Sequence, residues 1–313
     1  MSILLISTIT PCYKMKPYLK LFLDELPNQT IFNQIEIVLD HNEPDEEELG
    51  WVRDFQAKYP GRIKHIITNP VVFIGPSMNR CIREASAPLL AIWNVDDLRT
   101  PNSLELQVAA MNEGADFVYG NFQYVRKFGA KNGSWFDFSK YQSQPEEFKR
   151  SMLLGPFMAF RKSLTEKAGM FDEQLKSGAD FDLAIRLAYH GKPGMTKGSL
   201  GYYLNEGKGA STRPNNKQPL ERTVIELRYG TYEKMDYDFV VRALNYDIEH
   251  LYVAGEKTHI SQYIPNYTQM IVDAKENLIE PGLRKYAFKK VIQYNKIRNE
   301  AKTIVKRLIY GIK

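Results

Sequence analysis

The sequence has few of the features that mark a secreted, membrane-spanning or disulfide-stabilised protein. Only two cysteines, Cys12 and Cys81, occur in 313 residues, and their spacing matches no metal site. This low count favours a reducing compartment. No apolar segment reaches the roughly 20 residues that a membrane-spanning helix needs. The first thirteen residues lack a basic leader and contain Pro11, which predicts a first strand rather than a signal peptide. These absences together predict a cytoplasmic protein.

The composition is that of an ordinary globular protein, but the charge is unevenly distributed. With 43% hydrophobic and 25% charged residues, the chain is neither disordered nor a membrane bundle. The net charge is +5, yet residues 281–313 hold ten basic residues and one acidic residue, which leaves −4 for the rest. Apolar residues recur there at helical spacing, so we expect a basic amphipathic helix. It either lies peripherally on an anionic membrane surface or packs its apolar stripe on the body.

The first hundred residues alternate apolar strands with helices. We expect strands at 3–10, 35–39, 62–68 and 89–94, and helices at 16–26, 46–58 and 77–84. Such strands indicate a mostly parallel sheet covered on both faces. A further strand at 116–119 precedes an aromatic, loop-rich stretch at 120–141, whose rings either stack on sugars or pack under the loops. After loops rich in glycine and proline, the remainder is predicted to be helical. We therefore expect an α/β domain at 1–212 and a helical C-terminal region at 213–313.

Two adjacent carboxylates, Asp96 and Asp97, directly follow the apolar strand at 89–94. Thr100 and Pro101 suit the N-cap and first position of a helix at 101–112, which places both acids in a strand-to-helix turn. In an open α/β sheet such turns lie at the carboxyl edge, where ligands bind. Two hard oxygen ligands suit Mg²⁺ or Mn²⁺, and these ions suit a diphosphate. The alternative is a solvated turn that is stabilised by the dipole of the following helix.

A second acidic pair, Asp180 and Asp182, begins a helix that we expect to end at Gly191. Residues two apart on a helix are separated by roughly 200° around its axis, so the two acids cannot face one cleft. A carboxylate in a first turn is stabilised by the helix dipole whether or not it is catalytic. The pair alone therefore does not identify an active site.

Four segments, in order and spacing, resemble the family 2 glycosyltransferases. They are Ile9-Thr10-Pro11-Cys12-Tyr13, Glu36-Ile37-Val38-Leu39-Asp40-His41, the run from Asn94-Val95-Asp96-Asp97 to Pro101, and the block from Phe160-Arg161 through Phe171-Asp172-Glu173 to Asp180-Phe181-Asp182 and Arg186. The resemblance covers about residues 3–212. It implies the GT-A fold, a Rossmann-like, mostly parallel central sheet flanked by helices. It also implies transfer of a sugar, with inversion, from a nucleotide-sugar donor to a hydroxyl group.

The resemblance assigns expected roles to single residues. Asp180 would be the catalytic base that deprotonates the acceptor hydroxyl, and Asp182 would be a structural partner on the other side of the helix. Asp96 and Asp97 would hold Mn²⁺ or Mg²⁺, and through it the donor diphosphate. Glu206 stands roughly where many relatives place a metal-binding histidine, and is the third candidate ligand. The remaining donor-binding candidates are Tyr13, expected to stack on the nucleobase, with Pro11, Asp40, His41, Asn79 and Arg80.

Three positions depart from the family pattern: Asn94 precedes the metal carboxylates, Ala179 precedes the base, and His41 replaces an aspartate expected to touch the base of the nucleotide. They motivate an alternative, a catalytically weakened relative that binds nucleotide or glycan without turnover. The acids at 96, 97 and 180 favour the enzyme. A nucleotidyltransferase is disfavoured, since no glycine lies between Pro11 and Lys16. The expected partners are a nucleotide-sugar, with a UDP-sugar favoured, and a glycan or lipid-linked glycan acceptor, but no nucleic acid.

Overall fold

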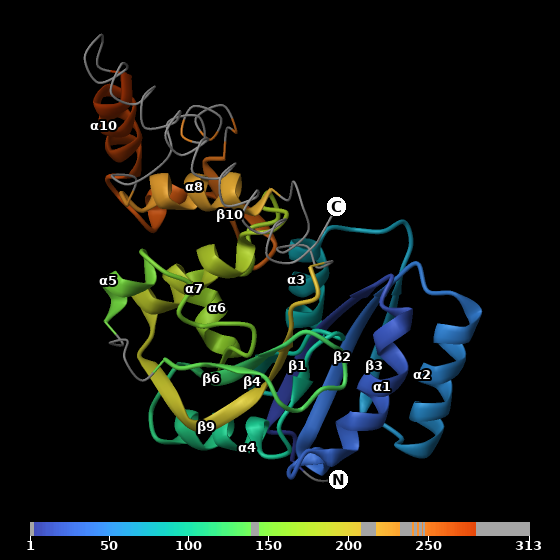
Figure 1. The fold of residues 1–313 in the computed structure, drawn as a ribbon. Coiled ribbons are helices and arrows are strands. Elements are labelled where there is room, and N and C mark those ends of the chain that lie inside the picture. The colour runs from blue at the N-terminus through green and yellow to red at the C-terminus, as the bar shows by residue number, and fades with distance from the viewer. Residues whose placement is uncertain are drawn as a thin grey trace, which may run out of the picture.

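The structure is a computed structural model that describes residues 3–138, 144–207, 217–231, 240, 243, 246 and 248–279. Strands and helices alternate through its N-terminal part, as the apolar pattern predicts (Figure 1). The strands are β1 (Ile6–Tyr13), β2 (Ile35–Asn42), β3 (Ile63–Thr68), β4 (Leu89–Ile92), β5 (Leu98–Arg99), β6 (Phe117–Val125), β7 (Ser134–Phe136), β8 (Ala159–Arg161), β9 (Pro193–Leu204), β10 (His250–Val253) and β11 (Glu256–His259). The α-helices are α1 (Lys16–Glu25), α2 (Glu46–Lys58), α3 (Ile74–Glu84), α4 (Ser103–Asn112), α5 (Pro145–Phe148), α6 (Thr165–Ala168), α7 (Ala179–His190), α8 (Gln218–Arg228) and α10 (Tyr267–Ile279).

The central sheet has a parallel half and a mixed half. Its strand order is β3-β2-β1-β4-β8-β6-β9-β5, and β7 pairs with β6. Strands β3, β2, β1 and β4 run parallel, so their carboxyl ends lie at one edge. In the other half β8 is antiparallel to β4 and β6, and β5 is antiparallel to β9, whereas β9 is parallel to β6. The sheet is thus less parallel than the sequence predicts, because β5 and β8, of 2 and 3 residues, are too short to show a pattern.

The alternation of side chains along β2 divides the interior into two cores. Ile35, Ile37 and Leu39 pack with apolar residues of α1, α2 and α4. Val38 points to the opposite face, where it packs with Met78 and other residues of α3. Because successive residues of a strand alternate between faces, Asp40 follows Val38 toward α3, and His41 follows Leu39 toward α2. This alternation decides the surroundings of both predicted site residues.

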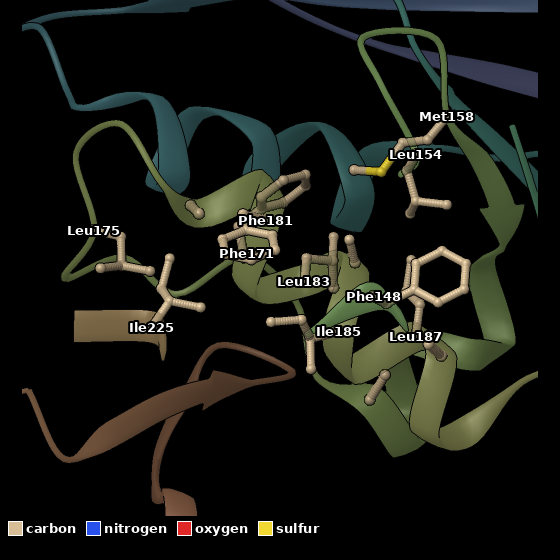
Figure 2. Close-up of a cluster of buried hydrophobic side chains, with 14 of the residues drawn as sticks. Phe148, Leu154, Met158, Phe171, Leu175, Phe181, Leu183, Ile185, Leu187 and Ile225 are labelled. Atoms are coloured by element: carbon tan, nitrogen blue, oxygen red, sulfur yellow. The ribbon is translucent and has the colours of Figure 1, made fainter. Parts of the chain in front are cut away.

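The core on the α3 side continues across α7 and α8 (Figure 2). Every residue from Phe181 to Ala188 of α7 is buried. Leu175, which precedes α7, and Ile225 of α8 belong to the same apolar cluster and lie beside each other in Figure 2. A helix surrounded by protein on all sides must pair any charge that it carries. We therefore expect each buried charged residue of α7 to have a partner of opposite charge.

The helix that follows Asp96 and Asp97 begins at Ser103 rather than at Pro101. Residues 98–99 form β5 instead, and the Thr100 hydroxyl donates to the carbonyl oxygen of Ser199 at 2.7 Å. Thr100 thus joins this turn to β9 and does not cap α4. The pairing of β5 with β9 brings the chain around residue 204 next to the acidic turn.

The described part of the C-terminal region contains α8 and α10, and also the antiparallel pair β10 and β11. Within the described ranges, no helix has both the length and the apolar character needed to cross a membrane. The predicted basic helix at 281–313 and the predicted domain boundary at 212/213 lie outside the described residues.

Candidate active site

Asp40 and Arg80 meet at the carboxyl end of β2. The Asp40 carboxylate is fully buried and accepts hydrogen bonds from the hydroxyl groups of Thr68, at 2.6 Å, and Ser77, at 2.5 Å. Arg80 of α3 donates to Asp40 at 3.1 Å, and 30% of its side chain remains exposed. The structure therefore brings these two predicted donor residues together. Since both Asp40 oxygens are bonded inside the protein, a ligand reaches Arg80 first.

His41 lies on the other face of β2, away from Asp40. Its buried ring places Nδ1 at 3.3 Å from Nε2 of His65 and Nε2 at 3.7 Å from the Glu48 carboxylate. Burial lowers the pKa of His41 to about 4, and that of His65 to about 4 as well. Both rings are therefore neutral at pH 7. The structure makes His41 a core residue between β2, β3 and α2.

Tyr13 is the last residue of β1 and presents its ring at the carboxyl edge of the sheet. Its side chain is 37% exposed, and the ammonium group of Lys14 lies 5.0 Å from the ring centroid. Pro11, two residues earlier, is the register partner of Asp40 on β2. Pro11, Tyr13 and Asp40 thus share one side of the sheet with Arg80. An exposed ring here offers a flat apolar face for stacking.

Asp97 is a buried carboxylate held in place by backbone and amide donors. The Leu204 N–H donates to Oδ1 at 3.1 Å, and the Asn94 side-chain amide donates to Oδ2 at 3.2 Å. Burial raises the pKa of Asp97 well above its ordinary value, and the neighbouring Asp96 raises it further. The buried guanidinium of Arg99 opposes this rise. Asn94, which departs from the family pattern, therefore supports the acidic turn directly.

Asp96 and Glu206 complete an acidic group at this turn. Burial raises the pKa of Asp96, and the Glu206 carboxylate adds to the rise. Glu206 follows β9, whose pairing with β5 carries it toward the turn. The hydroxyl of Tyr18 on α1 donates to Glu206, and this bond raises the pKa of Tyr18 to about 12. The three predicted metal-ligating acids are therefore electrostatically coupled, Asp97 to Asp96 and Asp96 to Glu206.

Asp96, Asp97 and Glu206 have the donor atoms and the charge that suit a divalent cation, but their side chains are not arranged around one point. Their donors are all carboxylate oxygens, which Mg²⁺ and Mn²⁺ prefer. In the part of the chain that the structure describes, no three His, Cys, Asp or Glu residues are grouped so as to hold a metal ion. Burial nevertheless raises the pKa of both Asp96 and Asp97, and repulsion by Glu206 and by Asp96, respectively, adds to the rise; a bound cation relieves such repulsion. The residues present thus fit a divalent ion in donor type and in charge.

Asp180 is the second residue of α7, after the N-cap Gly178. Its Oδ1 accepts a hydrogen bond from the N–H of Phe181 at 2.8 Å. Burial raises the pKa of Asp180, and the nearby carboxylate of Glu221 adds to the rise. A carboxylate with a raised pKa is a stronger proton acceptor once it is ionised. This environment suits the predicted base.

Asp182 belongs to a buried ion network. Its carboxylate accepts from Arg186 and from Arg228, each at 2.8 Å, and Arg228 also pairs with Asp172 at 2.7 Å. Burial by itself raises the pKa of Asp182, but the two guanidinium groups outweigh burial and hold the pKa below its ordinary value. The network joins α7, α8 and the segment before α7. Asp180 and Asp182 therefore have separate surroundings, as the helical geometry predicts.

Asn79 connects α3 to the chain that leads to α7. Its amide donates to the carbonyl oxygen of Phe171 at 2.8 Å and to the Glu173 carboxylate at 2.9 Å, and its oxygen accepts from the Phe171 N–H at 2.8 Å. The side chain is fully buried. Asn79 thus fixes residues 171–173, whereas its neighbour Arg80 is the one that reaches the surface.

The sequence comparison decides the family. The sequence model of glycosyl transferase family 2 matches residues 7–169, which is more than half of the chain. The chain belongs to this family. An uncharacterized glycosyltransferase of Methanocaldococcus jannaschii is 27% identical over 192 residues, which are 58% of this chain and 64% of that protein. The match thus spans less than two thirds of the length of that relative.

Solved structures show that the fold extends beyond the matched residues. The crystal structure of S. aureus TarS 1–349 in complex with UDP-GlcNAc matches with a TM-score of 0.61 and 16% identity, over 88% of this chain and 81% of that chain. A further crystal structure of TarS 1–349 gives a TM-score of 0.57 and 14% identity, over 91% of this chain and 77% of that chain. These likenesses confirm the predicted GT-A fold.

Two residues beside α7, Glu221 and Arg228, are absent from the expectations drawn from the sequence, and a third, Asp172, is expected there only as part of the family pattern, without a role of its own. Glu221 and Arg228 lie on α8, where both are fully buried. The signal was present in the sequence, because these charged residues are spaced like the buried apolar positions Val224 and Ile225 of the same helix. A charge in an apolar stripe indicates a buried partner, although it does not say which one.

Proposed function

We propose that this protein is an inverting glycosyltransferase that moves a sugar from a nucleotide-sugar donor to a hydroxyl group of an acceptor. The observation that carries the proposal is the buried acidic turn of Asp96 and Asp97 in a chain of glycosyl transferase family 2. A buried carboxylate, Asp97, beside a second, half-buried one, Asp96, costs stability, so the presence of both at a ligand-binding edge calls for a functional explanation. The separate carboxylate of Asp180 supplies the base that such a reaction needs.

We assign donor binding to the carboxyl edge of the parallel half of the sheet. The Tyr13 ring would stack on the nucleobase, and the partly exposed Arg80 would pair with an anionic or polar group of the donor. Asp40 would hold Arg80 in place. The UDP-GlcNAc in the TarS complex supports a nucleotide-sugar as the donor class, and a UDP-sugar as the first to test.

In the proposed reaction, Asp180 accepts the proton of the acceptor hydroxyl as that oxygen forms a bond to the anomeric carbon. The bond from that carbon to the diphosphate breaks on the opposite side, which inverts the configuration and releases a nucleoside diphosphate. Asp96, Asp97 and Glu206 would hold a Mg²⁺ or Mn²⁺ ion, which when bound supplies positive charge to the leaving diphosphate. The Leu204 N–H and the Asn94 amide keep Asp97 oriented.

We propose a glycan or a lipid-linked glycan as the acceptor. Support comes from the sequence of residues 281–313, whose ten basic residues and helically spaced apolar residues suit an anionic membrane surface where a lipid-linked acceptor would lie. With such an acceptor, the transfer reaction would be a step of polysaccharide biosynthesis.

A donor screen tests the proposed function. The purified chain is titrated with a panel of nucleotide-sugars in the presence of Mn²⁺, and both its melting temperature and the release of nucleoside diphosphate are followed. We expect one donor to stabilise the fold by mass action and to be hydrolysed slowly without an acceptor. Failure of every donor in both assays would reject the proposal.

Replacing Tyr13 tests the nucleobase site. Stacking of a base on an aromatic ring contributes about 1–3 kcal/mol, so Tyr13→Ala should weaken nucleotide binding about 5- to 140-fold. Tyr189→Ala is the matched control, because that ring is 43% exposed on α7. Calorimetric titration with UDP measures both variants, and equal affinities for Tyr13→Ala and the unmodified protein would place the nucleobase elsewhere.

Removing the metal or Asp97 tests the acidic turn. We expect chelation by EDTA to abolish donor hydrolysis, and added Mn²⁺ or Mg²⁺ to restore it, because the leaving diphosphate needs positive charge. Asp97→Ala should lose hydrolysis in the presence of Mn²⁺ yet stay folded by circular dichroism. Asp54→Ala, an exposed aspartate of α2, is the control. Undiminished hydrolysis in EDTA would contradict the metal assignment.

A further inference from the structure

Glu221 of α8 binds the backbone that leads into α7. Its carboxylate is fully buried. It accepts hydrogen bonds from the N–H groups of Lys176 at 2.9 Å, Ser177 at 2.7 Å and Gly178 at 2.9 Å, and the Ser177 hydroxyl lies at 3.4 Å. Hydrogen bonds to an ionised acceptor are about twice as strong as neutral ones. One side chain thus binds the backbone of three consecutive residues.

The bound residues end at the start of the helix that carries Asp180. Gly178 is the N-cap of α7, and Asp180 is two residues further on. A Cβ atom added to Gly178 would lie 3.0 Å from Ile225 and 3.3 Å from the Cβ of Glu221, so α8 packs closely against this point. Leu175 and Ile225 add the apolar contact that Figure 2 shows. The position of Asp180 therefore depends on α8, which lies beyond the residues 7–169 of the family match.

Glu221 is also the charge that acts on Asp180. Burial raises the pKa of Asp180, and the Glu221 carboxylate raises it further. The Tyr246 hydroxyl faces Glu221, and burial together with Glu221 raises the pKa of that hydroxyl as well. Two cationic residues next to this contact, Lys176 and Arg222, have their charged groups over aromatic rings. The Lys176 ammonium lies 4.5 Å from the Phe73 ring centroid, and the Arg222 guanidinium lies 5.7 Å from that of Phe181.

The acids just before this loop are engaged by other partners. Glu173 accepts from Asn79 at 2.9 Å, and Asp172 pairs with Arg228 at 2.7 Å. Glu221 is therefore the carboxylate available to influence both the backbone and the protonation of Asp180.

We propose that Glu221 is a positioning residue for the base: it holds residues 176–178 so that Asp180 meets the acceptor hydroxyl. The inference rests on the proposed function of Asp180. It makes α8 part of the active centre, although α8 contributes no group to the reacting atoms. A misplacement of about 1 Å can cost roughly 100-fold in rate, so the loss of these bonds should be visible in turnover.

The test compares Glu221→Gln with Glu221→Asp and Glu226→Gln. Glu221→Gln removes the charge and places an amide group against the backbone N–H groups. We expect kcat for transfer to fall about 10- to 100-fold, the donor KM to change less than about twofold, and the acidic limb of the pH profile to move to lower pH. Glu221→Asp keeps the charge on a shorter side chain, so kcat should fall while the acidic limb stays in place. Glu226→Gln, on the same helix and paired with Arg222 at 2.7 Å, should behave as the unmodified protein.

The outcomes separate this inference from the proposed function. If the unmodified protein transfers sugar, Asp180→Asn does not, and Glu221→Gln matches the unmodified kcat and pH profile, the inference is wrong and the function stands. An unmodified protein that transfers nothing from any donor rejects the function itself.

Should Glu221→Gln fail to fold, amide hydrogen exchange of the unmodified protein tests whether Glu221 holds residues 176–178. Slow exchange at residues 176–178 supports the inference, because their N–H groups are then held by the carboxylate, and exchange at the rate of an open loop overturns it.

Discussion

Asp180→Asn should suppress glycosyl transfer by about 100- to 10,000-fold, since this is the usual cost of losing a general base. Nucleotide affinity should change little, because Tyr13 and Arg80 lie on other elements, β1 and α3. Burial raises the pKa of Asp180, and only the ionised carboxylate accepts a proton. Transfer by the unmodified protein should therefore decline as the pH falls through this raised pKa, at a higher pH than an ordinary aspartate would give.

Steady-state kinetics at saturating donor and acceptor, with calorimetric titration of UDP, measure both quantities. Asp182→Asn is the informative companion variant, since its site is a buried ion network rather than a reacting centre. If the folded Asp182→Asn variant lost transfer and Asp180→Asn retained it, the assignment of the base on α7 would be wrong.

Asp182→Ala should destabilise the fold by about 3–5 kcal/mol, because it leaves Arg186 and Arg228 buried without this partner. The pKa of Asp182 lies below its ordinary value, since the two guanidinium groups outweigh its burial. Because the pKa of Asp182 is lower in the folded state than in the unfolded chain, its carboxylate contributes fully to the free energy of unfolding at any pH above its pKa in the unfolded chain. That contribution is lost as the pH falls through the lower folded-state value.

Asp24→Ala is the matched control, because Asp24 forms an ion pair of the same i, i+4 spacing with Lys20 on the surface of α1, at 3.8 Å with both side chains about two thirds exposed. Exposed pairs contribute at most about 1 kcal/mol. Urea unfolding at pH 7 and at acid pH measures both variants. Equal free energies of unfolding for the two variants would contradict a structural role of the buried network.

The elements that the sequence predicts well are those with a strong local signal. The periodicity of α2 and the apolar run of β4 are visible in a few residues, and the acids after β4 interrupt that run abruptly. The opposite surroundings of Asp180 and Asp182 follow from helical geometry alone. Each of these predictions needs no knowledge of distant segments.

The features that the sequence does not predict depend on contacts between distant residues. The strand β5 exists because β9, about a hundred residues later, pairs with Leu98 and Arg99. Tyr18 and Glu206 meet across 188 positions of the chain, and Glu221 reaches Gly178 across 43. The family resemblance places His41 beside the donor, but in the structure its ring faces α2, because His41 is one residue out of phase with Asp40 along β2. The site is thus predictable where one strand or helix defines it, and unpredictable where the tertiary fold assembles it.

The anomeric configuration of the released sugar shows whether this protein inverts the anomeric carbon and whether Asp180 is its base. Proton nuclear magnetic resonance, recorded during the first turnovers of donor hydrolysis with the donor found in the screen and Mn²⁺ present, distinguishes the α- and β-anomers of the released sugar before they interconvert. We expect a sugar of opposite configuration to the donor, formed by the unmodified protein and not by Asp180→Asn. A sugar that retains the configuration of the donor, or one formed equally well by Asp180→Asn, would contradict this expectation.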